Sequence, residues 1–320
     1  MVAGRMRIAH SVPKHREYMR SSYPSEPILA EAAAHIWEKY QQGSERPEAV
    51  IPEMLQEHLM AGVIGKGERG ELVARLLLTL AYDAAVRRCG SELHTRAVPL
   101  ATFLQELFGE ANYAIIANSK PDVGDLKFCD AFKDAQVRFT HFVRAGDDSV
   151  VSTDAAYVAI LRSMAFQCSH GQEAIDGLVP IALMDGALEE SNMSGMAVSV
   201  KDRLTAGSKA SFSDINPSKL SFFPKDQELF QDTGSGRPFI SLVMELGIST
   251  KETPAAGGGY VNRPPSKRRK VGDVPLEVAK PKVVRPTRGA EMSDPEKPEP
   301  PQNPHYHIYA YSCRHRFTKW

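Results

Sequence analysis

Two short apolar runs within residues 171–203, "GQEAIDGLVPIALMDGALEESNMSGMAVSVKDR", carry ionisable side chains at their ends. Asp176 stands before the first run, and Lys201 ends the second. A carboxylate is a hard oxygen ligand of the kind Mg²⁺ prefers, and an amine can orient or deprotonate an attacking water molecule. The pair therefore suggests metal-dependent phosphodiester hydrolysis. The alternative is that strand ends are commonly polar without any catalytic role.

The elements that must position these residues can be read from periodicity and end signals. The segment 68–89 is apolar nearly all round, which is typical of a buried helix. We expect strands 178–184, 195–201 and 238–246 to form one mixed sheet with helix 68–89 packed across it. The remaining predicted elements are helices over 25–40, 50–61, 99–108 and 152–168, and strands over 135–145 and 305–313.

The order of these elements resembles a known fold. The segments "RGELVARLLL", "GQEAIDGLVPIAL", "MSGMAVSVKDR" and "RPFISLVMELG" follow one another as a helix and three strands. This pattern is similar to the restriction-endonuclease-like fold of the PD-(D/E)XK superfamily, whose core runs α-β-β-β-α-β. It resembles most the nuclease-type domains of crinkler (CR) effectors and their fungal relatives. The resemblance spans about residues 50–250 and the last strand, and it implies an α/β fold with a mixed sheet flanked by helices.

The resemblance also implies roles for three side chains. Asp176 would be the central Mg²⁺ ligand, Glu71 an additional acid from the first helix, and Lys201 the group that orients or deprotonates the water. We expect the two carboxylates and the amine to lie within about 10 Å of each other, as a shared Mg²⁺ site requires. The implied activity is Mg²⁺-dependent cleavage of DNA.

One position departs from the pattern of active members. On a strand, residues 197, 199 and 201 share one face, so the residue two before the lysine meets the metal. Active members carry Glu, Asp or sometimes Gln there, whereas this chain carries Ser199, a poor Mg²⁺ ligand. We therefore expect slow or absent cleavage, and we expect Ser199→Glu to raise it if the rest of the site is intact. A degenerate descendant that binds nucleic acid without cutting it fits the same pattern.

Each candidate residue also has an ordinary structural interpretation. Glu71 lies four residues before Arg75 and could pair with it on the helix surface. Asp176 precedes a glycine, and Asp-Gly is common in turns. Lys201 could be a solvated strand end. The second functional hypothesis is therefore a non-enzymatic protein-interaction domain.

Composition narrows the class of protein. The chain has 320 residues, and its 39 Lys and Arg balance its 39 Asp and Glu, so any basic surface must be local. The four cysteines, which lie far apart without CxxC spacing, indicate reduced thiols of an intracellular protein. They are Cys89, Cys129, Cys168 and Cys313. The N-terminus lacks the apolar region of a secretory signal, and no apolar run is long enough to span a membrane, so no membrane partner is expected.

Four regions are expected along the chain. Residues 1–49 form an N-terminal helical extension, and residues 50–248 form the α/β domain with a helical insertion over about 90–170. Residues 249–304 hold 11 of the 22 prolines and are predicted to be a disordered linker. Residues 305–320 return as a strand of the α/β domain, because a lone strand is not stable.

The linker contains a concentrated basic segment. Residues 261–290 hold nine Lys or Arg against two acids, and "PPSKRRKV", 264–271, includes Lys267, Arg268, Arg269 and Lys270. Such a run suits a nuclear import receptor or nucleic-acid phosphates, so a nuclear location is suspected. The alternative is a solvated basic linker. After it, the residues His305, His307, Cys313 and His315 could bind zinc, although histidines that alternate with tyrosines on a strand are more often packing residues.

Overall fold

The computed structural model describes most of the body of the chain. The described residues are 8–11, 20–22, 26–43, 66–146, 151–169, 175–183, 187–201, 215, 236–246, 260–261 and 303–311. The helices are α1 (Glu26–Gly43), α3 (Lys66–Arg88), α4 (Leu100–Phe108), α5 (Glu110–Ala117), α6 (Phe128–Ala131), α7 (Thr153–Leu161) and the 3₁₀ turn η3 (Glu190–Asn192). The strands are β1 (Ile8–Ser11), β2 (Arg20–Ser22), β3 (Val98–Pro99), β4 (Ala135–Val137), β5 (His141–Arg144), β6 (Met164–Gln167), β7 (Gly177–Leu183), β8 (Met193–Lys201), β9 (Phe239–Glu245), β10 (Tyr260–Val261) and β11 (His305–Tyr311).

Nine of the described strands form one mixed sheet. Its main path runs β10-β11-β9-β8-β7-β4-β3, and β6 joins it by pairing with β7 and β5. The strands β6, β7 and β8 form an antiparallel meander, whereas β9 is parallel to β8 and β11 is parallel to β9. The prediction of an α/β fold with a mixed sheet is confirmed.

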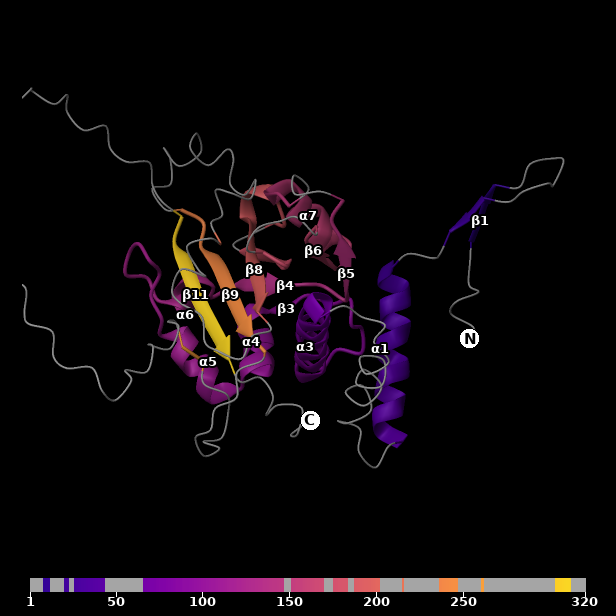
Figure 1. Cartoon of the computed structure of the whole chain (residues 1–320), viewed down its shortest axis with the longest axis horizontal. Helices are drawn as coiled ribbons and strands as arrows, with labels where there is room; N and C mark the ends of the chain where they lie inside the picture. The colour runs from indigo at the N-terminus through magenta and orange to yellow at the C-terminus, as the bar shows by residue number, and fades with distance from the viewer. Residues whose placement is uncertain are drawn as a thin grey trace, which may run out of the picture.

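The two faces of the sheet are covered by different helices. On one face, Leu78 and Tyr82 of α3 share a core with Met196 of β8, and α4 and α5 extend that core. On the other face, Ile160 of α7 shares a core with Ala197 of β8. Figure 1 shows α3 with the strands β8, β9 and β11 on one side and α1 on the other. The expectation that helix 68–89 packs against the sheet is therefore confirmed.

Residues 152–168 do not form one helix, and that prediction is wrong. The helix α7 begins as expected, because Ser152 Oγ accepts a hydrogen bond from the Ala155 N–H. It ends at Leu161 because Ser163 adopts a left-handed conformation, with φ of 53°. The chain reverses there and continues as β6. A non-glycine residue in this conformation is uncommon, so the sequence carries no ordinary stop signal.

The region over about 90–170 also needs correction. Instead of a helical insertion alone, it holds the strands β3, β4, β5 and β6 of the main sheet as well as short helices. The single strand predicted over 135–145 is two strands with different partners. β4 pairs with β3 and β7, whereas β5 pairs with β6. This region therefore belongs to the α/β body.

The ends of the chain agree with expectation in part. β11 pairs in parallel with β9 over seven residue pairs, so the predicted return of the last strand is confirmed. Within 1–49, the structure describes the antiparallel pair β1–β2 as well as the helix α1. The predicted helix over 50–61 lies outside the described residues. So does the predicted linker over 249–304, apart from β10 and Asn303–Pro304. None of the described helices combines the length and apolarity that crossing a membrane requires.

Candidate functional site at the strand ends

The start of β7 and the ends of β8 and β9 meet at the same end of the sheet. Gly177 of β7 pairs with Val198 of β8, and Lys201 of β8 pairs with Glu245 of β9. We call Asp176, Ser199, Lys201 and Glu245 the strand-end site. It contains two of the three residues that the sequence singles out.

Asp176 is held tightly by its neighbours. Its N–H donates to the Val198 carbonyl at 2.9 Å, and its carbonyl accepts from the Cys168 N–H at 3.0 Å. Its Oδ2 accepts a hydrogen bond from the Val200 N–H at 2.5 Å. One carboxylate oxygen thus satisfies a backbone donor of β8, which is a structural role.

The glycine after Asp176 packs closely against β6. Gly177 is the first residue of β7, and a Cβ atom there would lie 3.0 Å from the Phe166 carbonyl oxygen of β6. A side chain at 177 would therefore require a small shift of β6 beside the start of β7. Asp176 lies in a bend directly before β7, as an Asp-Gly pair at a strand end would.

Ser199 and Lys201 belong to the face covered by α7. Side chains alternate along a strand, and Ala197 packs in the core that includes α7. Ser199 is 1% exposed, and Lys201 is partly buried rather than free in solvent. The residue at the expected metal-binding position is thus a buried hydroxyl.

Glu71 approaches the strand ends from the opposite face. Its Oε2 lies 3.4 Å from Nη1 of Arg75 and accepts a hydrogen bond from Gln167 Nε2 at 3.4 Å. Gln167 is the β6 residue that pairs with Gly177. Burial, opposed by the charge of Glu71, lowers the pKa of Arg75 from its ordinary value. Glu71 therefore reaches the β6–β7 junction but comes from α3, across the sheet from the face of Ser199 and Lys201.

Glu245 is a residue that the sequence reasoning missed. It is fully buried, at 0% exposed, and it shares the face of Val243, which packs in the α7 core. Its parallel pairing places it beside Lys201. An acid directly after the apolar run "FISLVM" was the available signal, because a buried acid is found almost only with a partner.

The convergence of Glu71, Asp176 and Lys201 on one Mg²⁺ ion stays a prediction, and their surroundings do not favour it. Asp176 uses one oxygen on a backbone N–H, Glu71 lies on the other face, and Ser199 offers only a hydroxyl. Mg²⁺ demands near-octahedral oxygen ligation at about 2.0–2.1 Å. With Glu71 on the other face and a hydroxyl at position 199, the predicted residues offer this metal a weak ligand set.

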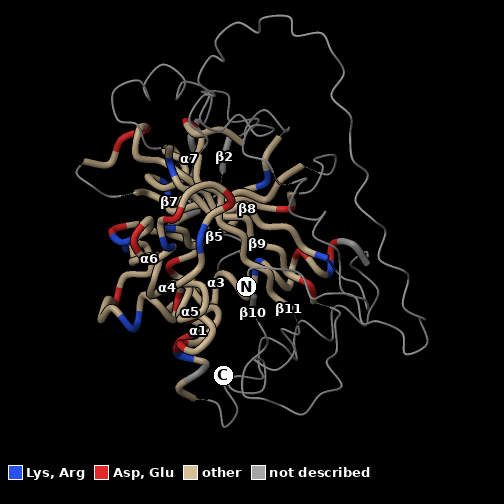
Figure 2. Tube along the Cα trace, turned by 90° about the vertical axis from the view of Figure 1, so that its left-hand side faces the viewer, with Lys and Arg blue, Asp and Glu red and all other residues tan. Residues whose placement is uncertain are grey.

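The other candidate residues lie elsewhere. His305 and His307 start β11 and form a group with Asp122, while Cys313 and His315 lie outside the described residues. The basic residues Lys267, Arg268, Arg269 and Lys270 also lie outside them. Figure 2 shows basic and acidic residues interspersed along the described elements.

Comparison with known families identifies one relationship. The model of a domain of unknown function, DUF8736, matches residues 1–212, which include α1, α3, α7 and the strands β1 to β8. The chain belongs to this family. No curated protein and no solved structure matches the chain.

Proposed function

We propose that this chain is a restriction-endonuclease-like domain that binds DNA without cleaving it. The observation that carries the proposal is the order α7, β6, β7, β8 and then β9. It provides a helix, three consecutive antiparallel strands and a further parallel strand. This order supports the first helix, the three strands and the last strand of the α-β-β-β-α-β core, with α7 as the first helix instead of α3. The position of the second core helix, between β8 and β9, lies outside the described residues apart from Ile215.

The loss of cleavage follows from the strand-end site. If α7 is the first helix of the core, the acid Glu71 of α3 is not the additional metal ligand. Ser199 supplies no charge, and Glu245 lies beside Lys201, where its carboxylate would offset the charge of the amine. A lysine whose charge is offset in this way is poorly suited to activate a water molecule.

DNA binding would depend on the basic segment. Residues 261–290 carry nine Lys or Arg against two acids, a local excess in a chain whose total charge is balanced. Neutralising phosphates releases counterions and favours association irrespective of base sequence. The same segment would serve a nuclear import receptor, so we propose a nuclear location together with DNA binding.

Fluorescence anisotropy of a labelled DNA duplex at several salt concentrations tests the binding. We expect affinity that falls with salt and does not depend on Mg²⁺. Replacing Lys267, Arg268, Arg269 and Lys270 by alanine should reduce the slope of log K against log salt by up to about 3.6, or about 0.9 for each lost phosphate contact. An unchanged slope would show that the basic segment does not contact the DNA phosphates. Absence of binding by the intact chain would favour the protein-interaction domain.

Plasmid nicking with Mg²⁺ tests the absence of cleavage. We expect no nicking by the natural chain or by Ser199→Glu, because restoring one acid does not bring Glu71 to the same face. Ser199→Gln, with the same size and no charge, controls for the extra volume, and circular dichroism checks folding. Nicking by Ser199→Glu that disappears in Ser199→Glu/Lys201→Met would show that the site is catalytic.

A fluorescent fusion tests the location. We expect nuclear accumulation that is lost when all four basic residues become alanine, since single losses leave most of the charge. An even distribution that the replacement leaves unchanged would contradict the nuclear proposal.

A further inference from the structure

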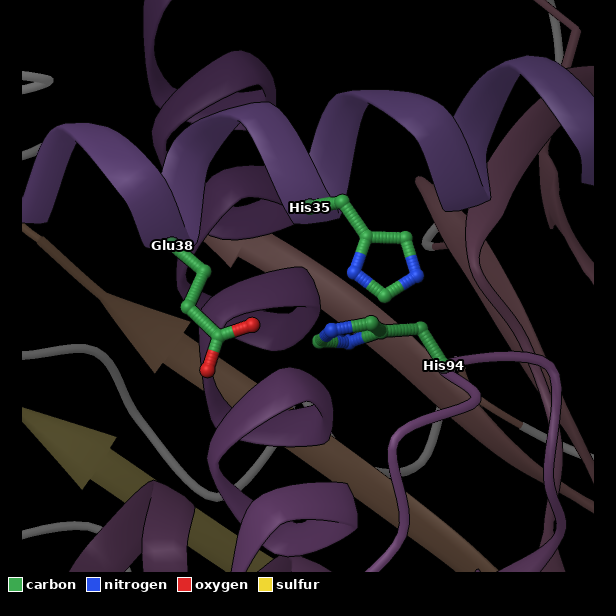
Figure 3. Close-up of side chains that lie close together, drawn as sticks. All are labelled: His35, Glu38 and His94. Carbon is green, nitrogen blue, oxygen red and sulfur yellow. The ribbon is translucent and has the colours of Figure 1, made fainter.

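A group of ionisable side chains lies where α1 meets the loop between α3 and β3. His35 and Glu38 are three residues apart on α1 and so lie on one side of the helix, and His94 comes from the loop. Their ligand-capable atoms all lie within 4.8 Å of one another. Figure 3 shows the two rings and the carboxylate turned toward one another. We call His35, Glu38 and His94 the α1 junction.

His94 is oriented by a buried acid. Its Nδ1 lies 3.1 Å from Oδ1 of Asp83, and both residues are buried. An ionised carboxylate can only accept, so Nδ1 carries the proton, and in the neutral ring Nε2 keeps its lone pair. Histidines that bind metals commonly donate the second ring N–H to a carboxylate in this way.

His35 has the same kind of support from Glu31. Nε2 of His35 lies 3.2 Å from Glu31 Oε1, which leaves Nδ1 as the ring nitrogen available to a ligand. The Glu31 carboxylate also accepts the backbone N–H groups of His94 and Thr95, each at 2.9 Å. Glu31 thus orients the ring and ties α1 to the loop.

The charges at the junction favour a cation. With neutral imidazoles, the carboxylates of Glu31, Glu38 and Asp83 bring three negative charges close to two rings. Arg87 near His94 opposes them with one positive charge. Within the part of the chain that the structure describes, Glu38 has no hydrogen bond or ion pair. A divalent ion would offset two of the charges and use the Glu38 oxygens.

We propose that His35, Glu38 and His94 bind one divalent transition-metal ion of the zinc class, which fastens α1 to the loop before β3. Imidazole and carboxylate ligands suit Zn²⁺ better than Mg²⁺ or Ca²⁺, which prefer all-oxygen sites. Tetrahedral zinc with bonds of about 2.0–2.2 Å puts two ligand atoms about 3.4 Å apart, so side-chain shifts of about 1 Å close the site. Three protein ligands leave a fourth position open to water or another ligand.

The β11 group of Asp122, His305 and His307 is a weaker candidate. Nε2 of His307 already bonds Asp122 at 2.6 Å, and Nε2 of His305 lies 2.5 Å from the Ser241 hydroxyl. The acid of this group is thus already engaged by one of its histidines, whereas within the described residues Glu38 of the α1 junction is not. The β11 group therefore provides a matched control with the same residue types.

Zinc titration of the full chain tests the proposal. Protein freed of metal with a chelator is titrated with Zn²⁺ by calorimetry, in a Cys89→Ser background that removes an exposed thiol. We expect one ion per chain and a raised unfolding temperature. His35→Ala and Glu38→Gln should each weaken binding by more than about 100-fold, beyond the loss from removing an orienting partner. His35 and Glu38 are both partly exposed on α1, so both variants should fold.

The control variant is His307→Ala, which should keep the full zinc affinity. Hydrogen exchange supplies a second measurement, because a bound ion should slow exchange of the amides in α1. Zinc affinity that survives both α1 substitutions would overturn the proposal, and so would affinity lost in His307→Ala alone. Exchange in α1 that is unaffected by zinc would refute the fastening role.

Discussion

The α1 junction and the β11 group each combine two histidines with one acid, yet their electrostatics are opposite. In the α1 junction, the hydrogen bond to Asp83 raises the pKa of His94 from its ordinary value, against the effect of burial. In the β11 group, burial and the charge of His307 lower the pKa of His305 to about 4, while Asp122 opposes them. Composition alone therefore does not decide the charge of a buried histidine.

The distance to a carboxylate explains the difference. Asp83 lies 3.1 Å from the His94 ring, within hydrogen-bond range, whereas Asp122 lies 3.9 Å from Nδ1 of His305. The hydrogen-bonding neighbour of His305 is the neutral hydroxyl of Ser241. A carboxylate at hydrogen-bond distance stabilises the charged ring, but one further away is outweighed by burial. The following predictions test this contrast, beginning with the largest effect.

Removing the orienting acid should have the largest effect. Asp83→Ala leaves the buried His94 ring N–H without its acceptor, so we expect the free energy of unfolding to fall by about 1–3 kcal/mol. Zinc affinity should fall about 10- to 100-fold. Urea unfolding and calorimetry measure the two quantities. Asp83→Asn keeps a hydrogen-bonding oxygen and should lose less stability than Asp83→Ala. Equal losses in the two variants would show that this hydrogen bond does not stabilise the fold.

The lowered pKa of His305 predicts a loss of stability in acid. Between pH 6.5 and about 4, the unfolded chain binds a proton at His305 that the folded chain does not, so stability falls as the pH falls through this window. Between pH 7 and pH 5 the loss should be no more than about 2 kcal/mol. Urea unfolding at pH 7 and pH 5 measures it. His305→Gln keeps a polar partner for Ser241 and should reduce the pH dependence; an unchanged pH dependence would contradict the assignment.

Removing the acid of the β11 group should have the smallest effect. The Asp122 side chain is 56% exposed, so its contact with His307 is screened by solvent. We expect Asp122→Ala to change the free energy of unfolding by at most about 1 kcal/mol and to leave zinc affinity unchanged. A loss as large as that of Asp83→Ala would show that the two groups are energetically alike.

Much of the fold could be predicted because its signals are local. The helices α1, α3 and α4 and the strands β7, β8, β9 and β11 all lie close to their predicted ranges. The strand β6 was missed because the left-handed Ser163 leaves no glycine or proline to mark the end of α7. The region 135–145 has one composition, and only pairing with different partners divides it into β4 and β5.

The sites depended more on tertiary structure. Alternation along β8 correctly groups Ser199 with Lys201, but it does not say which helix covers that face. The expected convergence of Glu71 with Lys201 would place α3 on the face of Ser199 and Lys201, whereas α7 covers that face. The spacing of His35 and Glu38 on a predicted helix was a visible signal. His94 could not be added to it, because the folded loop alone brings it to α1.

The late position of β11 in the sequence has a consequence for protein engineering. Glu245 and His305 are 60 positions apart, although β9 and β11 are neighbours in the sheet. The entropy of closing a loop rises slowly with its length, by about 0.6 kcal/mol for each doubling. An inserted reporter between the two strands would therefore cost the sheet little. The same pairing would let β11 serve as a detachable peptide tag that complements a chain ending after β9, so that reassembly reports on the folding of the body.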